Sequence, residues 1–141
     1  MDNPGIYSLT QKDGAGDVTI TTAGTIVTDW VTDLEGMLAA TISARLVYGS
    51  GGGDVRCFIQ TSLDQGNTAI DIACILFGMA GETEIINLSS LTPKTAQVAP
   101  TDGALADDTC IDGLLGDRFR CKIVSTGTYA GTLVSVRAAV R

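Results

Sequence analysis

The strongest constraint on the fold is an alternation of apolar and polar residues with period two, in segments bounded by glycine. It is clearest in residues 37–48, where every second side chain from Leu38 to Tyr48 is apolar and polar side chains such as Thr41 and Arg45 lie between them. Successive side chains of a strand point to opposite faces, whereas a helix would repeat every 3.6 residues. This segment is therefore predicted to be a half-buried β-strand.

Further segments of the same kind are spread along the chain. They cover residues 18–22, 25–31, 55–62, 70–76, 84–88, 118–123 and 133–140. Glycine, with 17 copies, separates them, and the three prolines are too few to do so. The pattern predicts an all-β chain of about seven or eight strands, closed as an antiparallel β-sandwich or a jelly-roll-like domain.

The segments 37–48, 55–62 and 70–76 are expected to form a meander, because short turns such as Gly49–Asp54 join them. The expected facing pairs are Tyr48 with Val55, Leu46 with Cys57, Ile59 with Ile72, and Cys57 with Cys74. Apolar side chains stay opposite apolar side chains in this register, so the prediction is self-consistent.

Length and composition predict one domain. The chain has 141 residues, near the commonest domain size, and 45% of them are hydrophobic, which argues against disorder. We expect a polar N-terminal arm at residues 1–17 and a single β domain at 18–141. Residues 89–117 predict a long loop, in which 101–105 and 108–114 are candidates for a short helical turn. Loops of this length are usually functional or pack on a neighbour.

Charge is distributed unevenly. The formal net charge of −7 argues against nucleic acid as a partner. Residues 118–141 nevertheless carry no acid, and their cations are Arg118, Arg120, Lys122, Arg137 and Arg141. We expect these cations to share one basic sheet face. They could steer an acidic partner, or they could neutralise the acidic loops of this chain or a neighbouring subunit.

Membrane and secretory signals are not evident. No apolar run approaches the roughly 20 residues of a membrane-spanning helix, and residues 1–17 lack a basic region followed by an apolar core. A soluble protein that is made and assembled in the cytoplasm is expected, without a membrane partner.

The residues capable of chemistry argue against an enzyme. The chain has no histidine, which removes the commonest general base and a common metal ligand. The richest acidic cluster is Asp102, Asp107, Asp108, Asp112 and Asp117. These carboxylates could act as an acid–base pair or bind calcium, but turn-forming and capping roles are favoured. We expect no catalytic, cofactor-binding or metal-binding residues and no cofactor.

The four cysteines, Cys57, Cys74, Cys110 and Cys121, form no CxxC pair. Cys57, Cys74 and Cys121 occupy expected inward positions, so buried free thiols are the favoured interpretation. A disulfide between Cys57 and Cys74, or between Cys110 and Cys121, is the alternative.

Residues 62–68, with the sequence SLDQGNT, resemble the Asp-box, in which serine, aspartate and threonine bond the backbone of a hairpin tip. Ala69 replaces the aromatic residue that usually follows. A single copy cannot build a propeller, so the motif predicts a turn only.

Three segments carry a wider resemblance. Residues 55–73 contain the QTS-x-D-x-G hairpin, residues 91–107 end in TDGALAD, and residues 116–141 begin with G-D-R-x-R. Together they resemble small virion structural proteins of tailed phages and prophages. The resemblance implies a non-enzymatic capsid decoration protein, located in the virion, whose partner is the major capsid protein. Because shell symmetry repeats any bound patch, it also implies a homotrimer over capsid three-fold positions.

Two other classes of function remain as alternatives. A tail or neck component would assemble through strand edges. A carbohydrate-binding module would need exposed aromatic side chains to stack on sugars, and the candidates are Tyr7, Trp30, Tyr48 and Tyr129.

Overall fold

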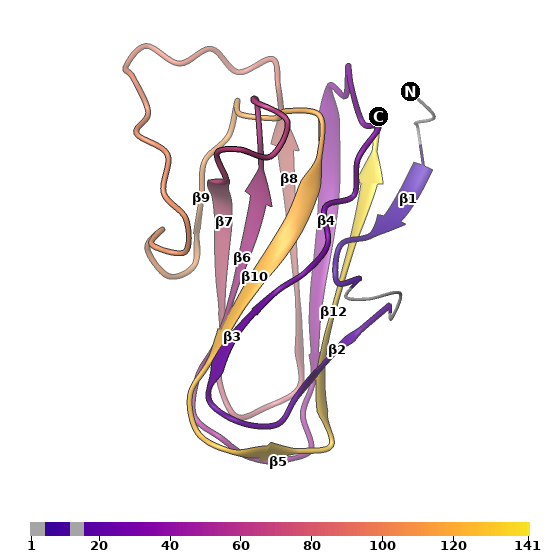
Figure 1. The fold of residues 1–141 in the computed structure, drawn as a ribbon, viewed down its shortest axis with the longest axis vertical. Coiled ribbons are helices and arrows are strands. Elements are labelled where there is room, and N and C mark those ends of the chain that lie inside the picture. The colour runs from indigo at the N-terminus through magenta and orange to yellow at the C-terminus, as the bar shows by residue number, and fades with distance from the viewer. Residues whose placement is uncertain (1–4, 12–15) are drawn as a thin grey trace.

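The alternating segments fold into two antiparallel sheets that pack face to face (Figure 1). A computed structural model describes residues 5–11 and 16–141, and over these residues it contains strands, turns and loops but no helix. Accordingly, no helix able to span a membrane occurs in the described part of the chain. The predicted all-β sandwich is confirmed.

One layer, which we call the β12 sheet, has the strand order β1-β12-β4-β8, and β2 also pairs with β12. Its strands are β1 (Gly5–Ser8), β2 (Val18–Ile20), β4 (Ala39–Val47), β8 (Glu82–Ser89) and β12 (Thr132–Val140). The other layer, the β10 sheet, has the order β3-β10-β6-β7-β9. Its strands are β3 (Gly24–Val27), β6 (Val55–Thr61), β7 (Ile70–Phe77), β9 (Thr109–Cys110) and β10 (Phe119–Ser125).

A third, two-stranded ribbon closes one end of the sandwich, where β5 (Ser50–Gly51) pairs with β11 (Tyr129–Ala130). Short pieces of this kind, together with β1 and β9, raise the number of strands above the predicted seven or eight. They are too short to show alternation in the sequence.

The core lies between the layers and uses the inward positions that the alternation predicts. The fully buried set includes Ile42 and Leu46 of β4, Val134 and Val136 of β12, and Phe119 and Ile123 of β10. Because apolar side chains from both sheets meet there, burial of this surface is the main stabilising contribution.

The predicted three-strand meander is wrong. β4 pairs with β12 and β8, while β6 lies in the other layer, so Tyr48 and Leu46 do not face Val55 and Cys57. The glycine-rich turn that follows β4 carries the chain from one sheet to the other. Alternation shows which side chains point inward, but two strands that face each other across a core have the same pattern as two strands that are paired.

β6 and β7 do pair, but the predicted register fails over most of their length. Cys57 lies opposite Ile75, and Ile59 lies opposite Ala73. A β-bulge between Ile59 and Gln60 inserts one extra residue in β7, which shifts every pair on one side of it by one position.

The expected single basic face is also wrong. Arg118, Arg120 and Lys122 lie at β10, whereas Arg137 lies on β12. These strands belong to different layers, so their outward side chains lie on opposite faces of the sandwich.

Part of the expected N-terminal arm belongs to the sandwich. Residues of β1 pair with the C-terminal half of β12, and Leu9 and Thr10 are buried. Residues 1–4 and 12–15 of the expected arm lie outside the described residues. The long segment 89–117 is a loop with the short strand β9 inside it, and neither 101–105 nor 108–114 forms a helical turn.

Candidate functional site at the loop end of the sandwich

The long loop is fixed to the β10 sheet by one buried carboxylate. Asp71, the second residue of β7, is fully buried. It accepts hydrogen bonds from the backbone N–H groups of Gly103 and Ala104 at 2.8 and 2.9 Å and from the hydroxyl of Thr101 at 2.8 Å. The N–H of Asp71 itself donates to the carbonyl of Thr101 at 2.9 Å. A buried carboxylate needs such partners, so the loop and the strand hold each other in place.

A chain of polar side chains extends this anchor across the sheet. Gln60 donates through Nε2 to Asp71 at 2.9 Å and to Asp102 at 2.7 Å, and its Oε1 accepts from Nε of Arg120 at 2.8 Å. Lys122 forms an ion pair with Asp102 at 3.2 Å. The hydrogen bond from Gln60, and then Lys122, lowers the pKa of the Asp102 carboxyl below its usual range. A connected network of hydrogen bonds and one ion pair therefore holds the loop against the sheet.

The remaining loop aspartates do not come together as a cluster. Asp107 pairs with Arg56 at 2.7 Å, Asp108 accepts from the N–H of Leu76 at 3.1 Å, Asp112 accepts from the N–H of Ser89 at 2.6 Å, and Asp117 pairs with Arg118 at 2.9 Å. Asp108 and Asp112 thus accept hydrogen bonds from the backbone, as the turn-forming and capping interpretation expects, whereas Asp107 and Asp117 form ion pairs. In the described ranges, no group of three or more acidic or cysteine side chains is placed to hold a metal ion. Two of the C-terminal cations, Arg118 and Lys122, neutralise the acidic loops of this chain, as one of the two interpretations expected.

The predicted Asp-box-like tip joins β6 to β7. The Oγ of Ser62 accepts from the N–H of Gly66 at 2.9 Å and donates to Asp64 at 2.8 Å, and Asp64 accepts from the N–H of Thr68 at 2.7 Å. Gln65 and Gly66 adopt left-handed backbone conformations, with φ of 62° and 89°. The prediction of a hairpin tip held by its own side chains is confirmed.

We expect Ser62→Ala to lower the free energy of unfolding by about 1–2 kcal/mol, because the partly buried N–H of Gly66 loses its acceptor. Urea unfolding measures the change. Ser50→Ala is the control, since the exposed Ser50 side chain makes no hydrogen bond within the described part of the chain. Equal midpoints for the two variants would contradict the role assigned to Ser62.

Of the four aromatic candidates for sugar stacking, Trp30 and Tyr129 make contacts within the fold, and Tyr7 and Tyr48 are half-buried against the core. The guanidinium of Arg120 lies 4.3 Å from the centre of the Trp30 ring, and that of Arg118 lies 6.0 Å from it. Tyr129 is buried and meets Tyr48 edge to face, with ring centres 6.5 Å apart. The cation–π contact occupies the ring of the one tryptophan, which a sugar would otherwise use.

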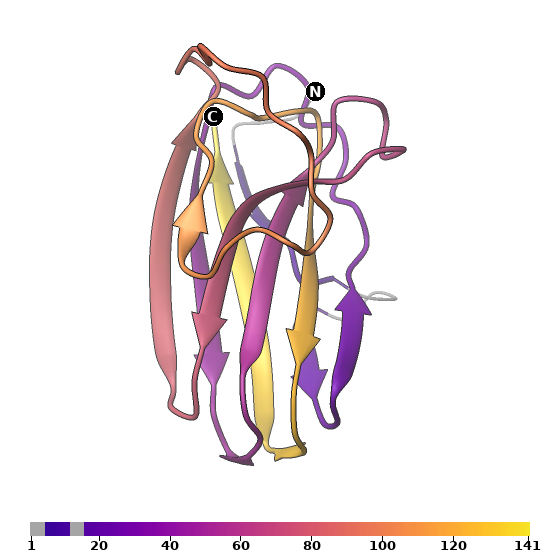
Figure 2. The ribbon, with the colours of Figure 1, turned by 90° about the vertical axis from the view of Figure 1, so that its left-hand side faces the viewer.

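An apolar hollow of about 370 Å³ lies between the hairpin tip and the long loop. Its walls include Leu63, Ile70, Lys94, Val98, Pro100 and Leu114, which we call the loop-end surface. In Figure 2 the loop arches over this end of the sandwich and descends in front of the β10 sheet. Leu63 is 67% exposed and Val98 is 37% exposed. Large apolar side chains in this position are typical of surfaces that bind another protein.

The cysteines are all free thiols. Cys57, Cys74 and Cys121 are buried, as favoured, and Cys110 is exposed. Cys57 and Cys121 point into the core, whereas Cys74 lies outside that cluster, with its Sγ 3.8 Å from Asp107. Neither Cys57 with Cys74 nor Cys110 with Cys121 forms the alternative disulfide.

Native thiol labelling should modify one cysteine, Cys110. Burial, and then the charge of Asp107, raise the pKa of Cys74 to about 12, and burial likewise raises the pKa of Cys121. Since the thiolate is the reactive form, these two thiols should be nearly inert at pH 8. Iodoacetamide labelling followed by mass spectrometry should give one rapid adduct, and Cys110→Ser should remove it. Rapid labelling of a second cysteine in the folded protein would contradict this assignment.

Searches among protein-family models, curated proteins and solved structures found no match. The chemistry of the loop-end surface therefore follows from the side chains that form it. Among the side chains that line the hollow, Lys94 carries the one charge, so the hollow offers shape and apolar contact.

The sequence predicted the loop and the hairpin tip but missed the residues that join them. Asp71 and Gln60 were assigned only as alternating positions of their strands. A signal was present, because an acidic residue interrupts the otherwise apolar run IDIACILF. An acid inside an apolar strand must find hydrogen-bond donors, and the long loop is the segment that supplies them.

Proposed function

We propose that this chain is a non-enzymatic structural protein of a tailed-phage particle and that it works by binding a neighbouring protein through the loop-end surface. One observation carries the binding role. A buried carboxylate and its network hold a surface loop in a fixed shape, and that loop presents exposed apolar side chains beside the hairpin tip. A preorganised apolar surface binds with a smaller loss of conformational entropy.

The resemblance to virion proteins supports the particle context. Two of the segments that carry it, residues 55–73 and 91–107, contribute most of the loop-end surface. They also contain both sides of its anchor, Asp71 and Thr101 to Ala104. In this proposal the partner is the major capsid protein, the chain decorates the head, and copies gather as a homotrimer around a shell three-fold position. A place in the tail or neck is the alternative.

The state of the aromatic residues favours this proposal over a carbohydrate-binding module. Sugar recognition by stacking uses an open aromatic face. The Trp30 ring is covered by Arg120, and Tyr129 is buried in the core. The exposed apolar side chains at the loop end are aliphatic.

The binding role can be tested with particles that lack this protein. Recombinant protein added to such particles should sediment with them, and Leu63→Glu should weaken binding at least tenfold, because a charge would be buried in the interface. Met79→Glu is the matched control, since Met79 is 61% exposed, similar to Leu63 at 67%, but lies at the turn after β7. Both variants change the net charge equally. Wild-type binding by Leu63→Glu, or the same loss in both variants, would contradict the assigned surface.

A further inference from the structure

The outer face of the β12 sheet differs from the rest of this acidic chain. Outward positions of β1, β4, β8 and β12 follow from the strand pairing, which places Ser8, Arg137, Ser43 and Ile85 in one row across the four strands. In these strands the outward positions carry no carboxylate, because Glu82 and Glu84 of β8 line a hollow on the inward side. Asp17, which directly precedes β2, lies beside this face, so acids there are few but not absent.

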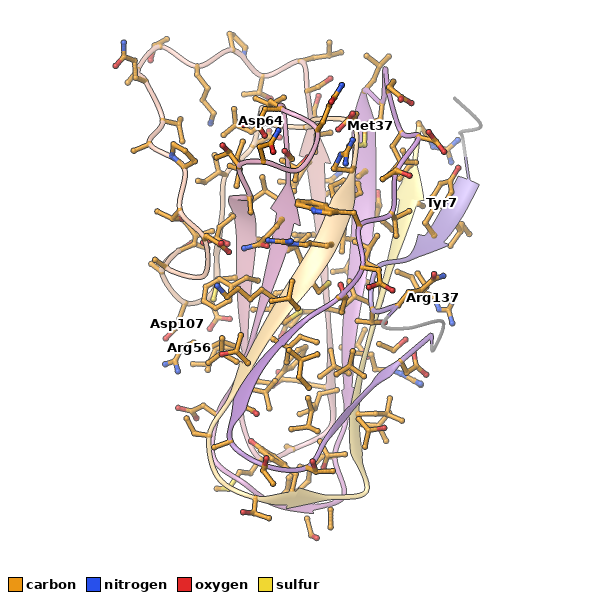
Figure 3. All side chains as sticks on the ribbon, in the orientation of Figure 1. Tyr7, Met37, Arg56, Asp64, Asp107 and Arg137 are labelled. Atoms are coloured by element: carbon orange, nitrogen blue, oxygen red, sulfur yellow. The ribbon has the colours of Figure 1, made fainter. Side chains whose placement is uncertain are left out.

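Two arginines dominate the face. Arg45 lies opposite Ser135, and Arg137 lies opposite Ser43, so the two arginines are diagonal neighbours on adjacent strands. Diagonal neighbours are about 7–8 Å apart at their Cα atoms, which long side chains can bridge. Together with the two serines and Asp17 they line a hollow of about 330 Å³. Figure 3 shows Arg137 on the side of the molecule away from Arg56 and Asp107.

Neither arginine has a charged partner within residues 5–11 and 16–141. Arg56, Arg118 and Lys122 each form an ion pair with an aspartate. Arg45 and Arg137 form none there, and Asp17, although it lines the same hollow, is not within ion-pair distance of either. Two neighbouring guanidinium groups with free donors are well suited to bind carboxylates in bidentate geometry.

Apolar side chains flank the pair. Ile6 of β1 is 74% exposed and Ile85 of β8 is 67% exposed. The strands that carry them are the two edges of the four-strand path, about 14 Å apart at the usual strand spacing. Between them lie Ser43, Arg137 and the hollow that the arginines line. Arginine flanked by exposed aliphatic side chains is typical of protein interfaces, whereas a free anion would need only the arginines.

We propose that this arginine face, made of Ser43, Arg45, Ser135, Arg137, Ile6 and Ile85, docks a carboxylate-bearing protein surface. Nucleic acid fits less well, because a phosphate backbone needs an extended basic surface and this face offers two arginines. The face belongs to the layer opposite the one that the long loop covers, so it is a second contact surface, separate from the loop-end surface. The inference goes beyond the proposed function and does not depend on the particle context.

The first test uses a hexaglutamate peptide as the probe in a titration of 15N-labelled protein at low ionic strength. Saturable shifts are expected for the amides of residues 43–45 and 135–137. Arg45→Gln/Arg137→Gln should weaken binding at least tenfold. Arg56→Gln/Lys122→Gln is the control, because it makes the same change in charge at cations that already have carboxylate partners. Shifts centred on residues 118–122, equal loss in both double variants, or no saturable shift would overturn the proposal.

The second test separates a protein surface from its alternatives. A peptide of alternating glutamate and leucine should bind more tightly than hexaglutamate, and Ile6→Ser/Ile85→Ser should remove that gain without changing the binding of sulfate. If sulfate binds as tightly as either peptide and the isoleucine variant has no effect, the face is a simple anion site and the proposal fails. If sedimentation equilibrium shows a dimer that Arg45→Gln/Arg137→Gln dissociates, the occupant is a second copy, which also overturns it.

Discussion

Asp71→Ala is expected to lower the free energy of unfolding by about 3–5 kcal/mol, the largest effect of any single change considered. The substitution leaves the N–H groups of Gly103 and Ala104, the hydroxyl of Thr101 and the amide of Gln60 without their acceptor. Gln60 is fully buried and the bonds from the loop are partly buried, so donors that lose the carboxylate keep much of the cost of leaving water. Urea unfolding at pH 7 measures the change.

The control for Asp71 is Asp107→Ala. Asp107 belongs to the same loop and forms an ion pair with Arg56, but the two side chains are 40% and 34% exposed, and pairs open to solvent contribute little. Its unfolding midpoint should stay close to that of the wild type. Hydrogen exchange should also show faster opening of residues 101–105 in Asp71→Ala than in the control. Equal midpoints for Asp71→Ala and Asp107→Ala would show that the carboxylate does not anchor the loop.

Gly116→Ala is expected to lower the free energy of unfolding by about 2–3 kcal/mol, because a side chain there overpacks a tight junction. Gly116 ends the long loop where it returns to the hairpin tip, and its N–H donates to the hydroxyl of Thr61 at 3.0 Å. A methyl group at this position would overlap the carbonyl oxygen of Ser62, a backbone atom that cannot rotate away. The loop end would have to move from the tip.

Gly78→Ala is the matched control for Gly116→Ala. A methyl group at Gly78 meets nothing within 4 Å, and neither glycine has a left-handed backbone conformation. The two substitutions therefore differ in packing alone. Thermal unfolding should show a clear loss for Gly116→Ala and almost none for Gly78→Ala. Similar unfolding temperatures would mean that the junction accommodates a side chain and is not tightly packed.

The predictable part of the fold is the part that depends on local pattern. β4 was found from its alternation, and the residues predicted to face inward, such as Ile42 and Leu46, are buried. Its partner strands were not predictable from that pattern, because β6 and β12 both offer apolar inward faces. The strand that pairs with β4 is β12, near the C-terminus. The two strands are far apart in the sequence and become neighbours only in the folded chain.

The same limit explains the errors in register and charge. The bulge adds one residue to β7, so Cys57 lies opposite Ile75 and not opposite Cys74 as predicted. The sequence contains no local signal for this bulge. Arg137 and Arg120 are close in sequence but belong to different layers, so a basic face that looked continuous is divided between two sides. For the candidate site, the Asp-box-like tip was predictable because its bonds are local, whereas the anchor at Asp71 joins residues that are 30 or more positions apart.

Electron cryomicroscopy of intact phage particles, produced by cells that express this chain, would locate the chain directly. We expect repeated density for the β-sandwich at fixed positions on the particle, with Leu63, Val98 and Leu114 of the loop-end surface against a neighbouring protein. Absence of the chain from the particles would contradict the proposed context. A sandwich bound with this surface open to solvent would contradict the proposed mode of contact.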